Sequence, residues 1–232
     1  MFKIIKLKSV LIAIVLIIVC VLCSVGIVAV VESKGVPKNQ YTIVVDAGHG
    51  GRDDGCQGEN GTKESDINLK IAKTLKVYLE SLGIKVVLTR SDGNGLYDAN
   101  ATNFKASDMA KRIEIINKCK PNMVISIHCN SFKDKTQKGA QAFYQENDLT
   151  SKDFALAMQQ QLNNQLEDNK KSANSGDFYI LKECNLPAVL IECGYLSNPQ
   201  EEKNLNSIKY QNKVAYAIMC GIVSYFNLCG ND

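Results

Sequence analysis

The 232-residue sequence lacks the marks of several common functional classes. It contains neither a G-x-G-x-x-G run nor a loop ending in G-K-[ST], which argues against a phosphate-binding loop. No internal repeat is present. Of the 27 Lys and Arg residues, Lys3, Lys6 and Lys8 precede a long apolar run, so the rest of the chain carries 24 basic and 24 acidic residues. This balance offers no basic face, and no nucleic-acid partner is expected.

Charged residues are absent from Val10 to Val31, where only Ser24 and Gly26 interrupt the apolar side chains. A helix needs about 20 apolar residues to cross a bilayer, so residues 9–31 are predicted to be a transmembrane anchor. The lysines before it place residues 1–8 in the cytoplasm and everything after it outside the cell membrane. The small residues leave cleavage as a signal peptide open, in which case the protein is secreted.

Paired cysteines are missing from the exported part of the chain. Cys20 and Cys23 lie inside the apolar run, and the other seven of the nine cysteines are scattered without a C-x-x-C pair. We interpret them mostly as small buried residues, although exported proteins often form disulfides.

After a polar linker at residues 32–40, strand-like and helix-like segments alternate through residues 41–232. Several of the apolar runs are continuous, as in strands covered on both faces. This alternation predicts a single α/β domain with a mostly parallel sheet of about six strands, flanked by helices. The expected strands are 41–46, 84–89, 122–127, 140–144, 178–181 and 188–192, and the expected helices are 64–82, 107–120, 152–167 and 208–226, with a short one opening at Asn198-Pro199.

The sequence has only two histidines, and each follows a predicted strand. His49 stands in VVDAGHGG and His128 in VISIHCNS, while a third strand, AVLIECG, ends with Glu192. Ligands of open α/β sheets bind at the carboxyl ends of the strands. A lone histidine is usually a satisfied surface or core group, but two histidines in this one position favour a shared site.

Glu64 opens a predicted helix on the same face as the buried positions Ile67 and Ile71. One interpretation is an acid in the first turn, favoured by the helix dipole. The other is a metal ligand. Two histidines and one glutamate form a common catalytic zinc set, in which the fourth position holds water. Zinc activates that water and polarises a carbonyl, and Glu192 is then the candidate to transfer the proton.

Cysteines adjoin two of these residues, since Cys129 follows His128 and Cys193 follows Glu192. Successive side chains of a strand point to opposite faces, so both thiols are expected to turn away from the metal. A structural Cys/His zinc site is therefore the less favoured interpretation.

Four blocks of the sequence, spread over residues 42–202, together resemble one known family. They are VVDAGHGGRDDG, KESDINLKIAKTLKVYLESLGIKVVLTR, NMVISIHCNS and LPAVLIECGYLSNPQEE. In this order they are similar to the zinc-dependent N-acetylmuramoyl-L-alanine amidases of the third amidase class. The resemblance implies zinc ligands at His49, Glu64 and His128, a catalytic acid/base at Glu192, and peptidoglycan as the substrate.

Within this family, an N-terminal anchor and a bare catalytic domain look most like the amidases of spore-formers that prepare the cortex for germination. Some clostridial relatives work with a lipoprotein partner, so such an activator is expected here. A vegetative autolysin, another exported zinc amidohydrolase and an inactive wall-binding module are the alternatives. Arg90 and Arg112 occur where relatives carry arginine, but ordinary strand-end and helix charges are the simpler interpretation.

Overall fold

The computed structural model describes residues 41–229. The predicted cytoplasmic tail, membrane anchor and linker, at residues 1–8, 9–31 and 32–40, lie outside these described residues and stay predictions. Within the described part, no helix is both long and apolar enough to cross a bilayer.

The described chain forms one six-stranded sheet, with strand order β2-β1-β3-β6-β4-β5, between layers of helices. Strands β1, β2, β3 and β6 pair in parallel, whereas β4 runs antiparallel to β6. This confirms a single α/β domain with a mostly parallel sheet. The elements are β1 (Thr42–Ala47), α2 (Glu64–Ser81), β2 (Lys85–Leu88), α3 (Phe104–Cys119), β3 (Met123–Asn130), β4 (Gln141–Tyr144), α4 (Leu149–Gln165), β5 (Asn174–Ser175), α5 (Tyr179–Lys182), β6 (Ala188–Tyr195), α6 (Pro199–Leu205) and α7 (Ile208–Cys229).

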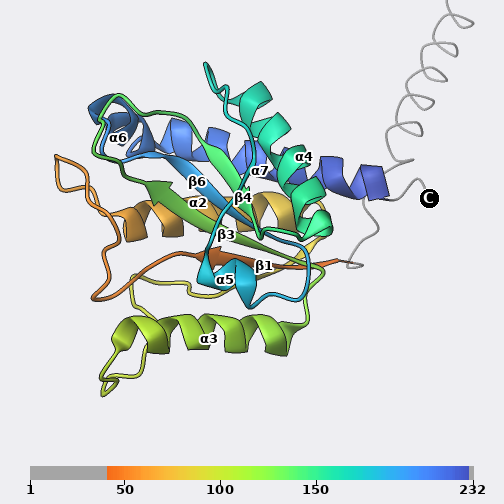
Figure 1. The fold of residues 1–232 in the computed structure, drawn as a ribbon, viewed down its shortest axis with the longest axis horizontal. Coiled ribbons are helices and arrows are strands. Elements are labelled where there is room, and N and C mark those ends of the chain that lie inside the picture. Colours follow the sequence, from red (N-terminus) through yellow and green to blue (C-terminus); the bar gives the residue numbers. More distant parts are fainter. Residues whose placement is uncertain (1–40, 230–232) are drawn as a thin grey trace, which may run out of the picture. The chain divides into compact units, whose positions relative to one another are not determined.

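Helices cover both faces of the sheet (Figure 1). Helices α2, α4 and α7 pack together on one face, while α3 and the short α5 lie on the other. The central strands are therefore buried on both sides, and Ile43, Val44 and Val45 have no exposed surface. This double burial explains why their sequence is continuously apolar rather than alternating.

The predicted strand at residues 178–181 is wrong, because the chain there forms the one-turn helix α5. A four-residue apolar run does not distinguish a helix turn from a strand by its periodicity. Ile180 and Leu181 are adjacent yet both buried in one apolar cluster, which a helix turn permits on a single face. The sixth strand is instead β5, which pairs with β4 over only two residues.

The pairing of the strands fixes where the candidate site residues emerge. His128 of β3 lies directly opposite Glu192 of β6, and β1 ends beside β3 at Ala47. Loop residues that follow β1 therefore meet the ends of β3 and β6 at one edge of the sheet. The predicted start of α6 is also confirmed, since the Asn198 side chain accepts from the backbone N–H groups of Gln200 and Glu201.

Candidate metal centre

His49 is held by a sharp turn that follows β1. Its own φ is +63°, which is uncommon for a residue other than glycine. The residue before it must be small, since a Cβ on Gly48 would lie 2.3 Å from the His128 ring. The two imidazoles consequently pack edge to face, with their ring centres 4.9 Å apart.

The Glu64 carboxylate lies between the two imidazoles. Its Oε1 is 3.2 Å from His49 Nε2 and 3.0 Å from His128 Nδ1. One ligand atom from each of the three residues falls within 4.8 Å of the others. The structure therefore brings together the three residues that the sequence predicted to bind metal.

Backbone and amide donors also fix the Glu64 carboxylate. Oε1 accepts from the backbone N–H of Cys129 and from the Asn68 amide, and Oε2 accepts from the backbone N–H of Cys56. Burial alone would raise the pKa of Glu64, but its hydrogen bonds with His128 and His49 hold this pKa well below the ordinary value. The carboxylate is therefore a buried, charged group between two imidazoles, and no ordinary first-turn acid.

Asp53 orients the His49 ring from the opposite side. Its Oδ2 lies 2.8 Å from His49 Nδ1, which leaves Nε2 directed at Glu64. Burial alone would lower the pKa of His49, but hydrogen bonds with Glu64 and Asp53 raise it to about 9. A carboxylate behind a histidine is a common way to fix the tautomer of a metal ligand. No sequence pattern singled out Asp53, and its position four residues after His49 is the one signal that could have pointed to it.

Glu192 reaches the same edge of the sheet from β6, opposite His128. Its side chain is buried, and its Oε2 makes no hydrogen bond among the described residues. Burial raises the pKa of Glu192 to about 7, and the negative charge of Glu64 acts in the same direction. The charges of His128 and His49 lower this pKa, but they do not offset the effect of burial. A carboxyl group in this state is able to exchange a proton at neutral pH.

Arg112, from α3, anchors the turn that carries His49. It is 1% exposed and donates to the carbonyl oxygens of Ala47 and His49 at 2.8 and 2.7 Å. It also donates to Asp46 Oδ1 and Asp108 Oδ2, each at 2.6 Å. Arg112 is therefore no ordinary helix charge, because it joins β1, α3 and the His49 turn.

Arg90, two residues after the end of β2, binds the same turn. Its guanidinium donates to the carbonyl oxygens of Ala47 and Gly48 at 2.8 and 3.0 Å, and also to Ser65 at the start of α2. The two arginines thus bind all three consecutive carbonyls of residues 47–49. Arginine suits this task because its planar group carries five donors in fixed directions.

The cysteines stay outside the cluster, as the alternation of the strands predicted. Cys129 and Cys193 are buried, and neither joins the group of ligand atoms. Cys129 Sγ lies instead 3.6 Å from the Asn68 side-chain oxygen. The cysteines whose side chains the structure describes are all free thiols.

The spacing of the donor atoms suits a tetrahedral cation. Zinc bonds of about 2.0–2.1 Å would place neighbouring ligand atoms about 3.3 Å apart. The two separations that involve Glu64 Oε1, 3.2 Å to His49 Nε2 and 3.0 Å to His128 Nδ1, lie close to that value, and all three ligand atoms lie within 4.8 Å of one another. Two imidazoles, one carboxylate and a neighbouring proton-transfer group therefore fit zinc.

The fold and the cluster define a class: an α/β protein with a candidate catalytic metal centre at the carboxyl ends of its parallel strands. The model of the N-acetylmuramoyl-L-alanine amidase family matches residues 43–224. The chain belongs to this family. The match spans both histidines, both glutamates and nearly all of the described domain.

Individual relatives cover the same region. The germination-specific N-acetylmuramoyl-L-alanine amidase of Bacillus subtilis is 34% identical over 199 residues, which are 84% of each chain. Among solved structures, the CwlD amidase of Clostridioides difficile in complex with the GerS lipoprotein is 39% identical with a TM-score of 0.79. That match covers 82% of this chain and 100% of the solved one. A second amidase of Clostridium difficile is 32% identical, with a TM-score of 0.73 over 82% of this chain and 98% of the other.

Replacing Arg112 with methionine is expected to destabilise the domain by about 3–5 kcal/mol, because buried Asp46 then loses its cationic partner. Urea unfolding measures this loss. Arg52→Met is the control, since Arg52 is exposed and, among the interactions described, its side chain contacts only the ring of Tyr97. The hydrogen bond of Arg52 to the Tyr97 hydroxyl comes from the backbone and survives the substitution. Equal stability of the two variants would contradict the anchoring role.

Zinc binding is expected to displace a proton from His49. Below its pKa of about 9 this imidazole is charged in the metal-free protein, whereas a ligand must be neutral. The apparent zinc affinity should therefore rise by about tenfold per pH unit between pH 6 and 8. Calorimetry in buffers of different ionisation enthalpy counts the released protons. A zinc affinity that does not change with pH would refute the displacement of a proton from His49.

Proposed function

We propose that this chain hydrolyses the amide bond between N-acetylmuramic acid and L-alanine in peptidoglycan, with zinc held by His49, Glu64 and His128. The observation that carries the proposal is the convergence of these three side chains beside Glu192, in a member of this amidase family. Peptidoglycan lies outside the cell, which agrees with the predicted exported domain.

The residues divide the chemistry between them. When bound, zinc would polarise the amide carbonyl and make a water molecule nucleophilic near neutral pH. Glu192, with a pKa raised to about 7 and one unpaired oxygen, accepts the proton of the attacking water. It then returns this proton to the departing nitrogen of L-alanine, so that the amine leaves uncharged. Asp53 keeps His49 Nε2 directed at the cluster throughout.

The proposed setting is the maturation of the spore cortex. The support comes from the Bacillus subtilis relative, whose name describes it as germination-specific, and from the high similarity to the clostridial CwlD amidase. Removal of peptides from muramic acid would allow muramic lactam to form, which germination requires. The same chemistry in a vegetative autolysin is the alternative.

Two further features belong to the same proposal. Residues 9–31 would anchor the chain in the cell membrane, with the catalytic domain outside or, after cleavage, secreted. A lipoprotein activator is proposed because the CwlD structure contains the GerS lipoprotein. Co-purification of a lipoprotein with the anchored chain from sporulating cells tests both features.

Glu192→Gln is expected to lower the rate of cleavage by about 10²–10⁴-fold, because a proton acceptor is lost from the transition state. Zinc content should not change, since Glu192 is not a proposed ligand. Glu183→Gln, at an exposed position, is the control. The assay follows peptides released from purified sacculi, which should begin with L-alanine and leave N-acetylmuramic acid intact. Undiminished release by Glu192→Gln would exclude this mechanism, and other products would indicate a different amidohydrolase.

Spores of a deletion strain are expected to lack muramic lactam and to germinate poorly, because their muramic acid keeps its peptides. Muropeptide analysis of purified cortex measures this directly, and the Glu192→Gln chain serves as the complementation control. If spores of the deletion strain have a normal muramic lactam content, and its vegetative cells remain joined after division, the autolysin alternative is supported instead.

A further inference from the structure

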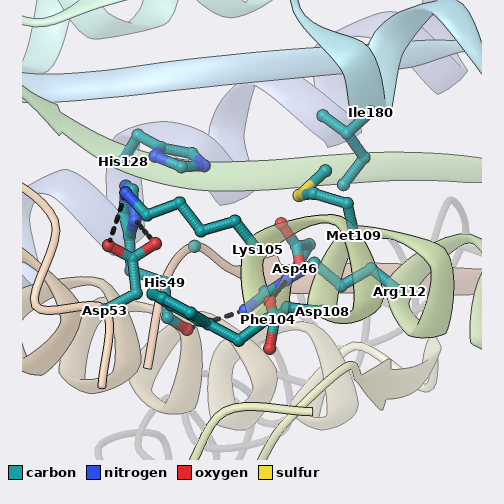
Figure 2. Close-up of a pocket in the computed structure, with 11 residues that line it drawn as sticks. Asp46, His49, Asp53, Phe104, Lys105, Asp108, Met109, Arg112, His128 and Ile180 are labelled. Atoms are coloured by element: carbon teal, nitrogen blue, oxygen red, sulfur yellow. Dashed lines mark hydrogen bonds and ion pairs between the residues drawn. The ribbon is translucent and has the colours of Figure 1, made fainter. Parts of the chain in front are cut away.

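A cavity of about 210 Å³ opens beside the two imidazoles, on the side of α3 and α5. His49 and His128 line one end of it (Figure 2). Phe104, Met109 and Ile180 contribute apolar surface, and the last two lie together at the far end. A substrate group seated in this cavity would therefore lie directly beside the reacting carbonyl.

The charged groups in the floor of the cavity already satisfy one another. Arg112 donates to both Asp46 and Asp108, each at 2.6 Å, and all three side chains are buried. The two carboxylates neutralise Arg112, and Arg112 in turn donates to the backbone carbonyl of His49. They are therefore poor candidates for binding a charged ligand.

Lys105, from the first turn of α3, is different. Its side chain is 64% exposed and reaches across the mouth of the cavity, where Nζ lies 3.2 Å from Asp53 Oδ1 (Figure 2). The other oxygen of the Asp53 carboxylate is hydrogen-bonded to His49, so Lys105 and His49 share this carboxylate as a partner. The flexible lysine stem allows the ammonium to turn toward an incoming anion. The cavity thus combines an apolar interior with one available cation at its mouth.

The proposed substrate has the matching chemistry on the peptide side of its scissile bond. The leaving group begins with L-alanine, which carries a small methyl group. In stem peptides the next residue is D-glutamate, whose α-carboxyl group is either free or amidated. A methyl group followed by a carboxylate suits an apolar cavity with a cationic mouth.

We propose that this cavity is the subsite for the leaving peptide and that Lys105 selects the free α-carboxylate of its second residue. The inference rests on the proposed amidase function and adds a specificity residue to it. The L-alanine methyl group packs against the apolar lining of the cavity, and the carboxylate takes the Lys105 ammonium in exchange for Asp53. An amidated substrate cannot make this ion pair.

The test compares two substrates that differ only in this group: muramoyl-L-alanyl-D-glutamate and its D-isoglutamine counterpart. For the zinc-loaded full-length chain, KM for the free acid should be about fivefold lower, as expected of a partly exposed ion pair. Lys105→Met should abolish the preference, so that the ratio of the KM values for the free acid and the amide approaches one. The ratio is compared within each variant, because the loss of Lys105 also removes the ion pair with Asp53. Lys105→Arg should restore the preference.

Lys111→Met is the matched control, because Lys111 lies on the same helix, pairs with Glu114 and does not line the cavity. Calorimetry with the zinc-loaded Glu192→Gln chain gives the same comparison as dissociation constants without turnover. Equal affinity for acid and amide, or an equal loss for both in Lys105→Met, would overturn the subsite. Such a result leaves the amidase reaction intact, whereas the failure of wild-type protein to release L-alanine peptides would refute the proposed function itself.

Discussion

The arrangement of the site depends on one buried carboxylate. Glu64 stands at the start of α2, and its two oxygens meet both imidazoles and the backbone N–H groups of Cys56 and Cys129. These partners come from the single loop that joins β1 to α2 and from the end of β3. A charge buried in this way is costly unless it is fully paired, so the carboxylate brings these segments to a common point. A cation placed among the same atoms would complete the pairing.

A second layer of charges supports the first. Arg90 and Arg112 bind the three carbonyl oxygens of residues 47–49, and Arg112 is neutralised by Asp46 and Asp108. The left-handed backbone of His49 is thereby fixed before any ligand arrives. Pre-organisation of this kind keeps ligand atoms at a working distance and lowers the cost of binding metal and substrate.

Much of this could be predicted from sequence, because parallel strands place residues that are far apart in the chain at one edge. The histidines after two strands, and Glu64 on the buried face of its helix, pointed to the cluster that the structure contains. The anchoring by Arg90 and Arg112 could not be predicted, since charge patterns do not reveal which carbonyls a guanidinium will meet. The prediction of a strand at residues 178–181 was wrong for a different reason. Ile180 and Leu181 are buried in a cluster with residues of α3 as part of a helical turn, and periodicity over four residues does not distinguish such a turn from a strand.

The proposed hydrolysis requires one zinc ion held by His49, Glu64 and His128, with a coordination position left for water. Anomalous diffraction at the zinc edge, from crystals of the zinc-loaded protein, tests it most directly. We expect a single strong peak about 2.0–2.2 Å from one nitrogen of each imidazole and from a Glu64 oxygen. A peak bound to Cys56 or Cys129, or a fourth protein ligand that closes the site, would contradict it.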